Sequence, residues 1–145
     1  PFVIRWPGHV QPGTRAKQLI QNIDYAPTFL EIAGLSPPNN LHGKSMVPLF
    51  SEGSEWRKSL YYAYYELGEH AVPQHFGVRT DRHKLIYFPM STEWNLFDLE
   101  IDPNEMRSLH AEPDYESKLK ELKSELNRLR VKFEAPPYPR PKTNP

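Results

Sequence analysis

Five basic side chains lie close together in the stretch AVPQHFGVRTDRHKLIYF, which begins at Ala71. They are His75, Arg79, Arg82, His83 and Lys84. Side chains that donate hydrogen bonds and carry positive charge can together bind an anion. A solvated sheet face, with each charge paired to a nearby acid, explains the same residues without a ligand. The elements that carry these residues decide between the two interpretations.

The stretch itself predicts a β-hairpin. Residues 76–80 and 83–88 have the apolar and aromatic content of strands, and Asp81-Arg82 separates them. Asp-Arg is not a favoured pair for a two-residue turn, so a longer turn is also compatible with the sequence. Aromatic runs at 59–66 and 94–99 predict one strand on each side of the hairpin. We therefore expect a four-stranded antiparallel meander between Leu60 and Leu99.

A long amphipathic helix is predicted after this sheet, from Asp114 to Phe133. Its apolar residues recur at alternating spacings of three and four, with Lys, Glu and Arg between them. They are Leu119, Leu122, Leu126, Leu129 and Phe133. The stripe could seed a coiled coil, but it spans few heptads, and packing across the aromatic sheet is favoured. The pattern predicts an α+β fold.

The first part of the chain predicts one further helix, from Tyr25 to Gly34. Asp24 is placed to cap its N-terminus, and Gly34 suits the left-handed residue that closes it. Its apolar face comprises Ile23, Ala26, Phe29, Leu30 and Ala33. Residues 1–8, an apolar run ending in Pro-Gly, predict a buried strand whose partners the sequence does not supply. We therefore expect the chain to be a piece of a longer protein.

Composition excludes several function classes. The sequence has 145 residues, equal numbers of basic and acidic side chains (18 each) and no cysteine. Because the net charge is zero, no overall positive electrostatic field attracts nucleic acid or an anionic membrane, and we expect neither as a partner. Without cysteine there is no thiolate metal site and no cysteine nucleophile. Phosphate-binding glycine loops, serine-hydrolase elbows and zinc-binding HExxH motifs are also missing, and the six histidines show no metal-ligand spacing.

Several ordered segments together resemble the C-terminal part of type I sulfatases, the formylglycine-dependent family. They are PFVIRWPG at 1–8, NIDYAPTFLEIAG at 22–34, GKSMVPL at 43–49, HFGVRTDRHKLI at 75–86, NLFDL at 95–99 and DP at 102–103. The resemblance covers nearly everything from residue 1 to about residue 134. Two positions depart from the family pattern, since Ser108 stands where Asn is common and His83 where Tyr is usual.

The resemblance implies an architecture and a chemistry. Residues 1–52 would end an alkaline-phosphatase-like α/β catalytic domain, 53–134 would form a small sheet-plus-helix subdomain, and 135–145 a proline-rich tail. The complete enzyme would hydrolyse sulfate esters, of a sulfated carbohydrate by expectation, with a formylglycine and a calcium ion. The sequence contains no Cys/Ser-x-Pro-x-Arg motif from which formylglycine is made. We therefore expect the chain alone to be inactive, with no catalytic or metal-binding residue of its own.

The resemblance also implies which residues approach the substrate. His70 and His75 resemble the histidines on the substrate side, and Arg79 is a third candidate for substrate binding. Arg79 and Lys84 could instead pair with acids such as Asp81 or Asp98.

The expected partners are the missing N-terminal part of the catalytic domain and the sulfated carbohydrate. Exposed apolar faces would permit self-association. A bacterial parent would be periplasmic or secreted, although the sequence does not fix the location. The alternative function is a non-catalytic binding or assembly module that uses the aromatic sheet and the amphipathic helix.

Overall fold

The computed structural model describes residues 2–51, 54–66 and 71–137. By their contacts the residues form two compact units, Pro1–Arg57 and Lys58–Pro145. The predicted boundary between residues 52 and 53 lies outside the described residues, as does the tail from residue 138 onward. No helix in the described part of the chain is long and apolar enough to cross a bilayer.

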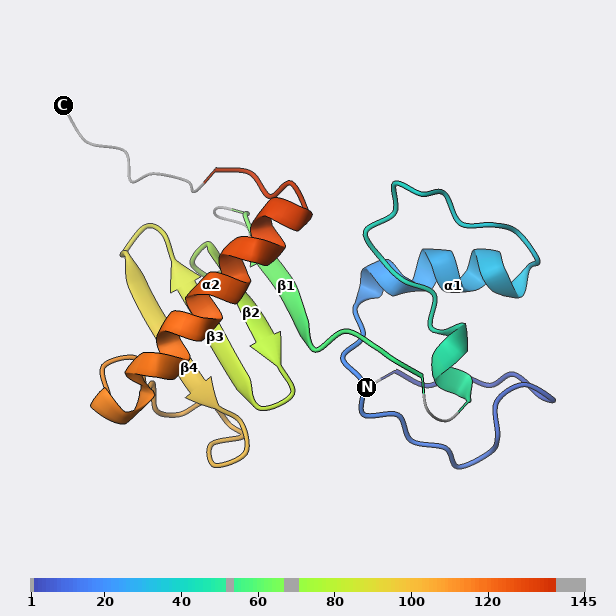
Figure 1. Cartoon of the computed structure of the whole chain (residues 1–145), viewed down its shortest axis with the longest axis horizontal. Coiled ribbons are helices and arrows are strands. Elements are labelled where there is room, and N and C mark those ends of the chain that lie inside the picture. Colours follow the sequence, from blue (N-terminus) through green and yellow to red (C-terminus); the bar gives the residue numbers. More distant parts are fainter. Residues whose placement is uncertain (1, 52–53, 67–70, 138–145) are drawn as a thin grey trace. The chain divides into compact units, whose positions relative to one another are not determined.

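The described residues of unit 1 form loops around one α-helix and two single-turn 3-10 helices (Figure 1). The 3-10 turn η1 (Asn22–Asp24) leads directly into α1 (Tyr25–Ile32), and η2 (Val47–Phe50) follows after a long loop. Gly34 has a φ of 73°, and the N–H groups of Gly34 and Leu35 donate to the carbonyls of Glu31 and Leu30. This is the left-handed helix ending that the sequence predicts.

Two predictions for this unit are wrong. Within residues 2–6 the structure shows no strand, because a strand needs a neighbour for its backbone hydrogen bonds and the described residues provide none there. Asp24 does not cap α1 with its side chain. Its carboxylate instead accepts hydrogen bonds from the backbone N–H groups of Gln21 and Lys44, and Thr28 donates to its carbonyl oxygen.

The predicted apolar face of α1 is largely exposed. The helix turns Pro27 and Thr28 inward, where the Thr28 hydroxyl accepts a hydrogen bond from the Met46 N–H. Ile23 is 41% exposed and Phe29 is 61% exposed. The contacts available within the unit decide which face of α1 is buried, and the hydrophobic pattern alone does not. The apolar face of α1 is therefore not covered by other described residues of unit 1.

Unit 2 contains the four-stranded antiparallel sheet predicted from the sequence. Its strands are β1 (Ser59–Tyr64), β2 (His75–Thr80), β3 (His83–Phe88) and β4 (Glu93–Asp98), in the order β1-β2-β3-β4. The β2–β3 connection has two residues, so Asp-Arg suffices for the turn. Thr80 stabilises this turn, because its hydroxyl donates to the His83 carbonyl and accepts from the His83 N–H.

A single helix covers one face of this sheet, as predicted. After the 3-10 turn η3 (Pro113–Tyr115), α2 (Glu116–Lys132) crosses the strands diagonally (Figure 1). Its leucines meet inward-facing residues of three strands to form the core of the unit. The fully or nearly buried members of this core are Phe76, Val78, Leu85, Leu96, Leu109, Leu122, Leu126 and Leu129. The stripe packs on the sheet, so no coiled coil is needed to bury it.

Candidate functional site

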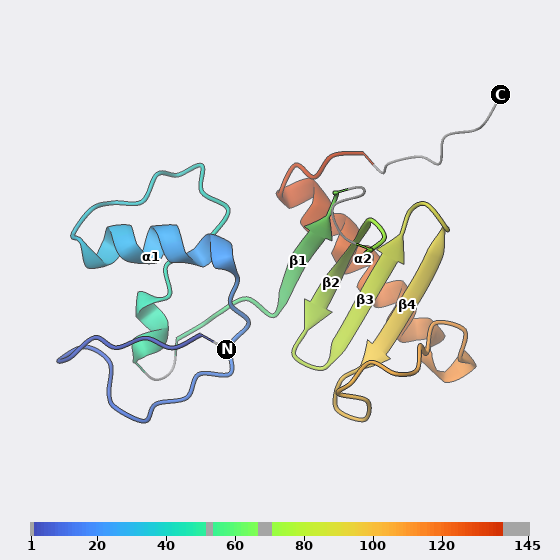
Figure 2. The same ribbon diagram turned by 180° about the vertical axis from the view of Figure 1, so that it is seen from behind.

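The sheet has a second face, opposite α2, which is turned toward the viewer in Figure 2. Successive side chains of a strand point to opposite faces. Phe76 and Val78 pack against α2, so His75, Gly77 and Arg79 lie on the second face. Tyr62, Tyr64, Lys84, Ile86 and Phe88 share it by the strand register. We call this surface the open face.

His75 lies among aromatic rings at one end of the open face. Its ring is stacked with that of Tyr64, with centroids 5.8 Å apart, and lies 5.6 Å from the Phe88 ring and 6.1 Å from that of Tyr62. Its Nδ1 is 2.9 Å from the carbonyl oxygen of Pro73. The strand backbone, three rings and one hydrogen bond thus fix the direction of the imidazole.

Tyr62 and Gly77 form the centre of the open face. They are cross-strand partners, and the Tyr62 phenol lies directly over the glycine. The Tyr62 hydroxyl is buried and has no hydrogen-bond partner among the described residues. Burial, with a smaller contribution from the charge of Glu105, raises the pKa of Tyr62, so the phenol stays neutral.

Arg79 lies at the hairpin end of the open face, four residues along β2 from His75. Its side chain is exposed, and in the described part of the chain it forms no ion pair. Its cross-strand neighbour Lys84 is instead paired with Glu105 at 2.5 Å, and its ammonium group lies over the Tyr62 ring. About 13 Å separates the Cα atoms of His75 and Arg79 along the strand. The two residues therefore mark opposite ends of one face.

The remaining basic residues of the opening stretch do not belong to this face. Arg82 binds both carboxylate oxygens of Asp98, at 3.0 Å and 2.7 Å, and the imidazole of His83 lies 3.7 Å from the same carboxylate. Asp98 is fully buried, and the hydrogen bonds from Arg82 lower its pKa. Burial lowers the pKa of His83 despite the neighbouring carboxylate. Arg82 and His83 therefore have an acidic partner already. The alternative that Lys84 pairs with an acid is confirmed, but its partner is Glu105 and not Asp81 or Asp98.

His70 lies outside the described residues, so its role stays a prediction. Among the residues that the structure describes, no group of three or more His, Asp and Glu side chains could hold a metal ion. The sequence also lacks cysteine. The open face can therefore offer binding groups, namely an imidazole, a guanidinium and aromatic rings.

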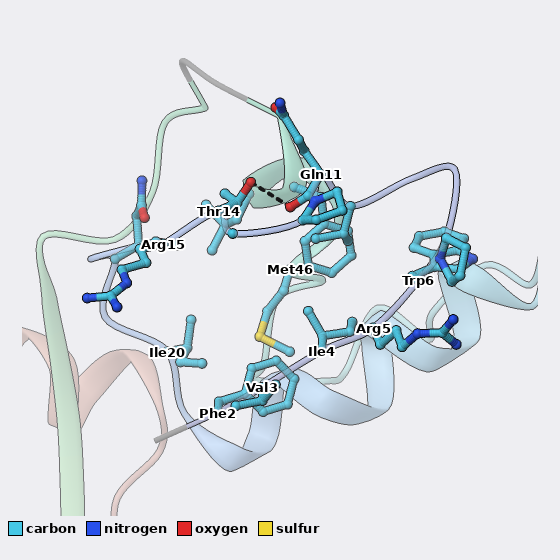
Figure 3. A pocket seen from close by; sticks show the side chains of 18 of the residues that line it. Phe2, Val3, Ile4, Arg5, Trp6, Gln11, Thr14, Arg15, Ile20 and Met46 are labelled. Atoms are coloured by element: carbon cyan, nitrogen blue, oxygen red, sulfur yellow. Dashed lines mark hydrogen bonds between the residues drawn. The ribbon is translucent and has the colours of Figure 1, made fainter.

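Unit 1 has a cavity of its own, of about 990 Å³, lined mainly by apolar side chains (Figure 3). The lining includes Phe2, Ile4, Ile20, Met46 and Leu49. In the view of Figure 3 the Met46 side chain lies between Ile4 and Ile20, and Thr14 donates a hydrogen bond to the Gln11 carbonyl. No acid–base pair lies among the lining residues, so the cavity suits apolar packing rather than catalysis.

Solved structures share this fold. A protein in complex with its substrate D-glucosamine-2-N,6-O-disulfate superimposes with a TM-score of 0.89 at 34% identity, over 94% of this chain and 29% of that one. The phosphonate monoester hydrolase of Silicibacter pomeroyi matches with a TM-score of 0.74, over 89% of this chain and 28% of that one. Its identity of 23% shows the fold alone. The fold class is that of alkaline-phosphatase-like sulfatases, as predicted.

Sequence comparison gives the family. The family described as N-sulphoglucosamine sulphohydrolase, C-terminal, matches residues 1–132, and the chain belongs to it. The N-acetylglucosamine-6-O-sulfatase of Bacteroides thetaiotaomicron is 40% identical over 128 residues, which cover 84% of this chain and 23% of that protein. An arylsulfatase of Clostridium perfringens is 31% identical over 130 residues, which cover 85% of this chain and 26% of that one. The chain thus spans about a quarter of the length of these relatives.

Proposed function

We propose that the complete protein hydrolyses a sulfate ester of a glucosamine-type sugar and that this chain forms its C-terminal part. The observation that carries the proposal is the 40% identity to the N-acetylglucosamine-6-O-sulfatase over most of the chain. Fold alone would not carry it, because phosphonate monoester hydrolases share the same fold. The substrate class therefore rests on the sequence identity.

In this proposal the chemistry that breaks the sulfate ester lies outside this chain. Family members use a formylglycine and a divalent cation, expected to be calcium. The sequence has no precursor of formylglycine, and the described residues offer no metal cluster. Both groups would come from the rest of the catalytic domain, which would also cover the exposed Phe29 and the apolar cavity of unit 1.

The proposed contribution of this chain is to substrate binding. His75, and His70 beside it in sequence, would approach the sugar, and Arg79 would offer a fixed positive charge at the other end of the open face. Its exposure and its lack of an ion pair among the described residues support this role for Arg79. The alternative of a non-catalytic assembly module has only the exposed apolar residues in its favour, and the missing catalytic domain explains those equally well.

An assay of the complete protein tests the proposal. We expect release of sulfate from N-acetylglucosamine 6-sulfate, faster than from an aryl sulfate, and no hydrolysis of an aryl phosphonate monoester. The chain alone, purified in parallel, is expected to release no sulfate, because it lacks a nucleophile and a metal. Hydrolysis of the phosphonate in preference to both sulfates would overturn the proposal.

A further inference from the structure

The sheet has two edge strands, β1 and β4, and they differ in how their outer edges are covered (Figure 2). The segment after β4 covers its edge, because the Leu109 N–H donates to the Leu96 carbonyl and the Leu96 N–H donates to the Ser108 hydroxyl. Natural edge strands are usually protected by such a cover, by a charge or by a proline. β1 (Ser59–Tyr64) has β2 on one side and contains neither a charged residue nor a proline. Its outer edge can therefore accept another strand.

The strand register shows which backbone groups of β1 point outward. In an antiparallel ladder the backbone groups of successive residues point alternately to the two sides of the strand. Leu96 uses its backbone groups on the outer side of β4, and the three strand registers carry this alternation across the sheet. By this count Tyr62 bonds to β2, and the N–H and C=O groups of Ser59 and Ala63 point outward. No hydrogen bond to these outward groups is found in the described part of the chain, and Ala63 is exposed.

Opposite charges flank β1. Lys58 precedes the strand and Glu66 follows it; both are exposed, and neither belongs to an ion pair found among the described residues. If two copies of β1 pair antiparallel about a two-fold axis at Tyr62, Lys58 of each copy lies opposite Glu66 of the other. Opposite charges directly across a strand pair are stabilising. The ladder can shift only in steps of two residues, and either shift separates these charges. The charges thus select one register.

From these observations we propose that β1 is a self-association edge, on which a second copy of this protein adds its own β1. The occupant is a second copy because the edge complements itself, with apolar and aromatic residues in the middle and opposite charges at its ends. The pairing makes one continuous sheet of four strands from each copy, with both α2 helices on one face and both open faces on the other. This proposal concerns assembly and does not depend on the proposed function.

Analytical ultracentrifugation of the complete protein tests the proposal. One strand pair buries less surface than a standard interface, so we expect a dimer that dissociates on dilution between about 100 and 1 μM. Lys58→Glu and Glu66→Lys each place like charges opposite one another, at both ends because of the two-fold symmetry. Each should raise the dissociation constant about tenfold or more. The double variant restores opposite charges and should recover the wild-type value.

Two further variants separate strand pairing from other effects. Glu93→Lys makes the same charge change as Glu66→Lys on the other edge strand, where Glu93 is exposed, and it should leave the dissociation constant unchanged. Ala63→Pro removes an outward N–H and leaves the hydrogen bonds to β2 in place. It should abolish the dimer, while circular dichroism of the monomer stays that of the wild type.

The outcomes decide the proposal without any reference to sulfatase activity. A complete protein that stays monomeric up to about 100 μM would overturn it. So would a dimer in which Lys58→Glu, Glu66→Lys and Ala63→Pro leave the dissociation constant unchanged. A dimer of the isolated chain beside a monomeric complete protein would show that the catalytic domain covers β1, and the second copy would then be the wrong occupant.

Discussion

The phenol of Tyr62 lies over the α-carbon of Gly77, its cross-strand partner, at the centre of the open face. A Cβ atom at position 77 would meet the phenol oxygen and also the backbone oxygen of Leu85, both well inside van der Waals contact. Only glycine lets the ring come this close to the strand. The pair therefore sets the shape of the surface between His75 and Arg79.

Gly77→Ala is expected to destabilise the chain by about 1–3 kcal/mol, because the added methyl group overpacks a filled site. Chemical denaturation followed by amide hydrogen exchange on β2 and β3 measures the loss. The Tyr62→Ala background removes one of the two clashes and leaves the one with the backbone of Leu85. Gly77→Ala should therefore also destabilise the Tyr62→Ala variant. If it does not, the Tyr62 ring alone causes the loss of stability in Gly77→Ala.

Tyr62→Phe is expected to raise the free energy of unfolding of the chain by about 1 kcal/mol. The hydroxyl is buried without a partner among the described residues, and an unsatisfied buried polar group is costly. Tyr64→Phe is the matched control, because its hydroxyl is exposed and makes only a 3.4 Å contact with Glu66. A less stable Tyr62→Phe variant would mean that the hydroxyl has found a partner.

Leu126→Ala is expected to cost about 2–5 kcal/mol, since Leu126 is 1% exposed in the core between α2 and the sheet. Val131→Ala on the same helix is the control, because Val131 is 81% exposed and should change stability by less than about 0.5 kcal/mol. Denaturation midpoints of both variants provide the comparison. Equal midpoints would contradict the packing of the leucine stripe on the sheet.

The elements that were predicted correctly are those with a strong local pattern. The strands are rich in aromatic and apolar residues, α2 has an uninterrupted leucine stripe, and Gly34 follows the last turn of α1. The strand predicted at residues 1–8 is absent from residues 2–8, because pairing depends on a partner that the sequence does not supply. A local sequence pattern thus predicts a helix or strand correctly when the residues that pair or pack with that element lie in the same chain.

The candidate site was harder to predict, because spacing along a strand does not determine ion pairs. Five basic residues were considered together, yet Arg82 and His83 lie against Asp98, and Lys84 pairs with Glu105. Both acids are distant in sequence from the cations they hold. Only the two-residue alternation of β2 could have shown that His75 and Arg79 share a face away from α2.

The fully buried carboxylate of Asp24 gives unit 1 a pH-dependent stability. Arg57 binds it with two hydrogen bonds of 2.5 and 2.6 Å, and the Arg57 side chain is only 13% exposed. Burial opposes ionisation, but the hydrogen bonds from Arg57 and from the N–H groups of Lys44 and Gln21 outweigh it, so the pKa of Asp24 is lowered. A carboxyl whose folded pKa is below its unfolded value stabilises the fold when ionised.

We therefore expect Asp24→Asn to destabilise unit 1 by about 3–5 kcal/mol at neutral pH, because it leaves the buried Arg57 without its counter-charge. The stabilisation by Asp24 is complete above the unfolded pKa of about 3.9 and is lost as the pH falls through the lower folded value. The difference between wild type and variant should accordingly shrink as the pH falls below about 4. Trp56, whose indole donates to the Leu19 carbonyl, reports on this unit by NMR. Asp81→Asn, at an exposed turn, should show no such dependence, and a difference that stays constant down to pH 2 would show that the ionised carboxylate is not what stabilises unit 1.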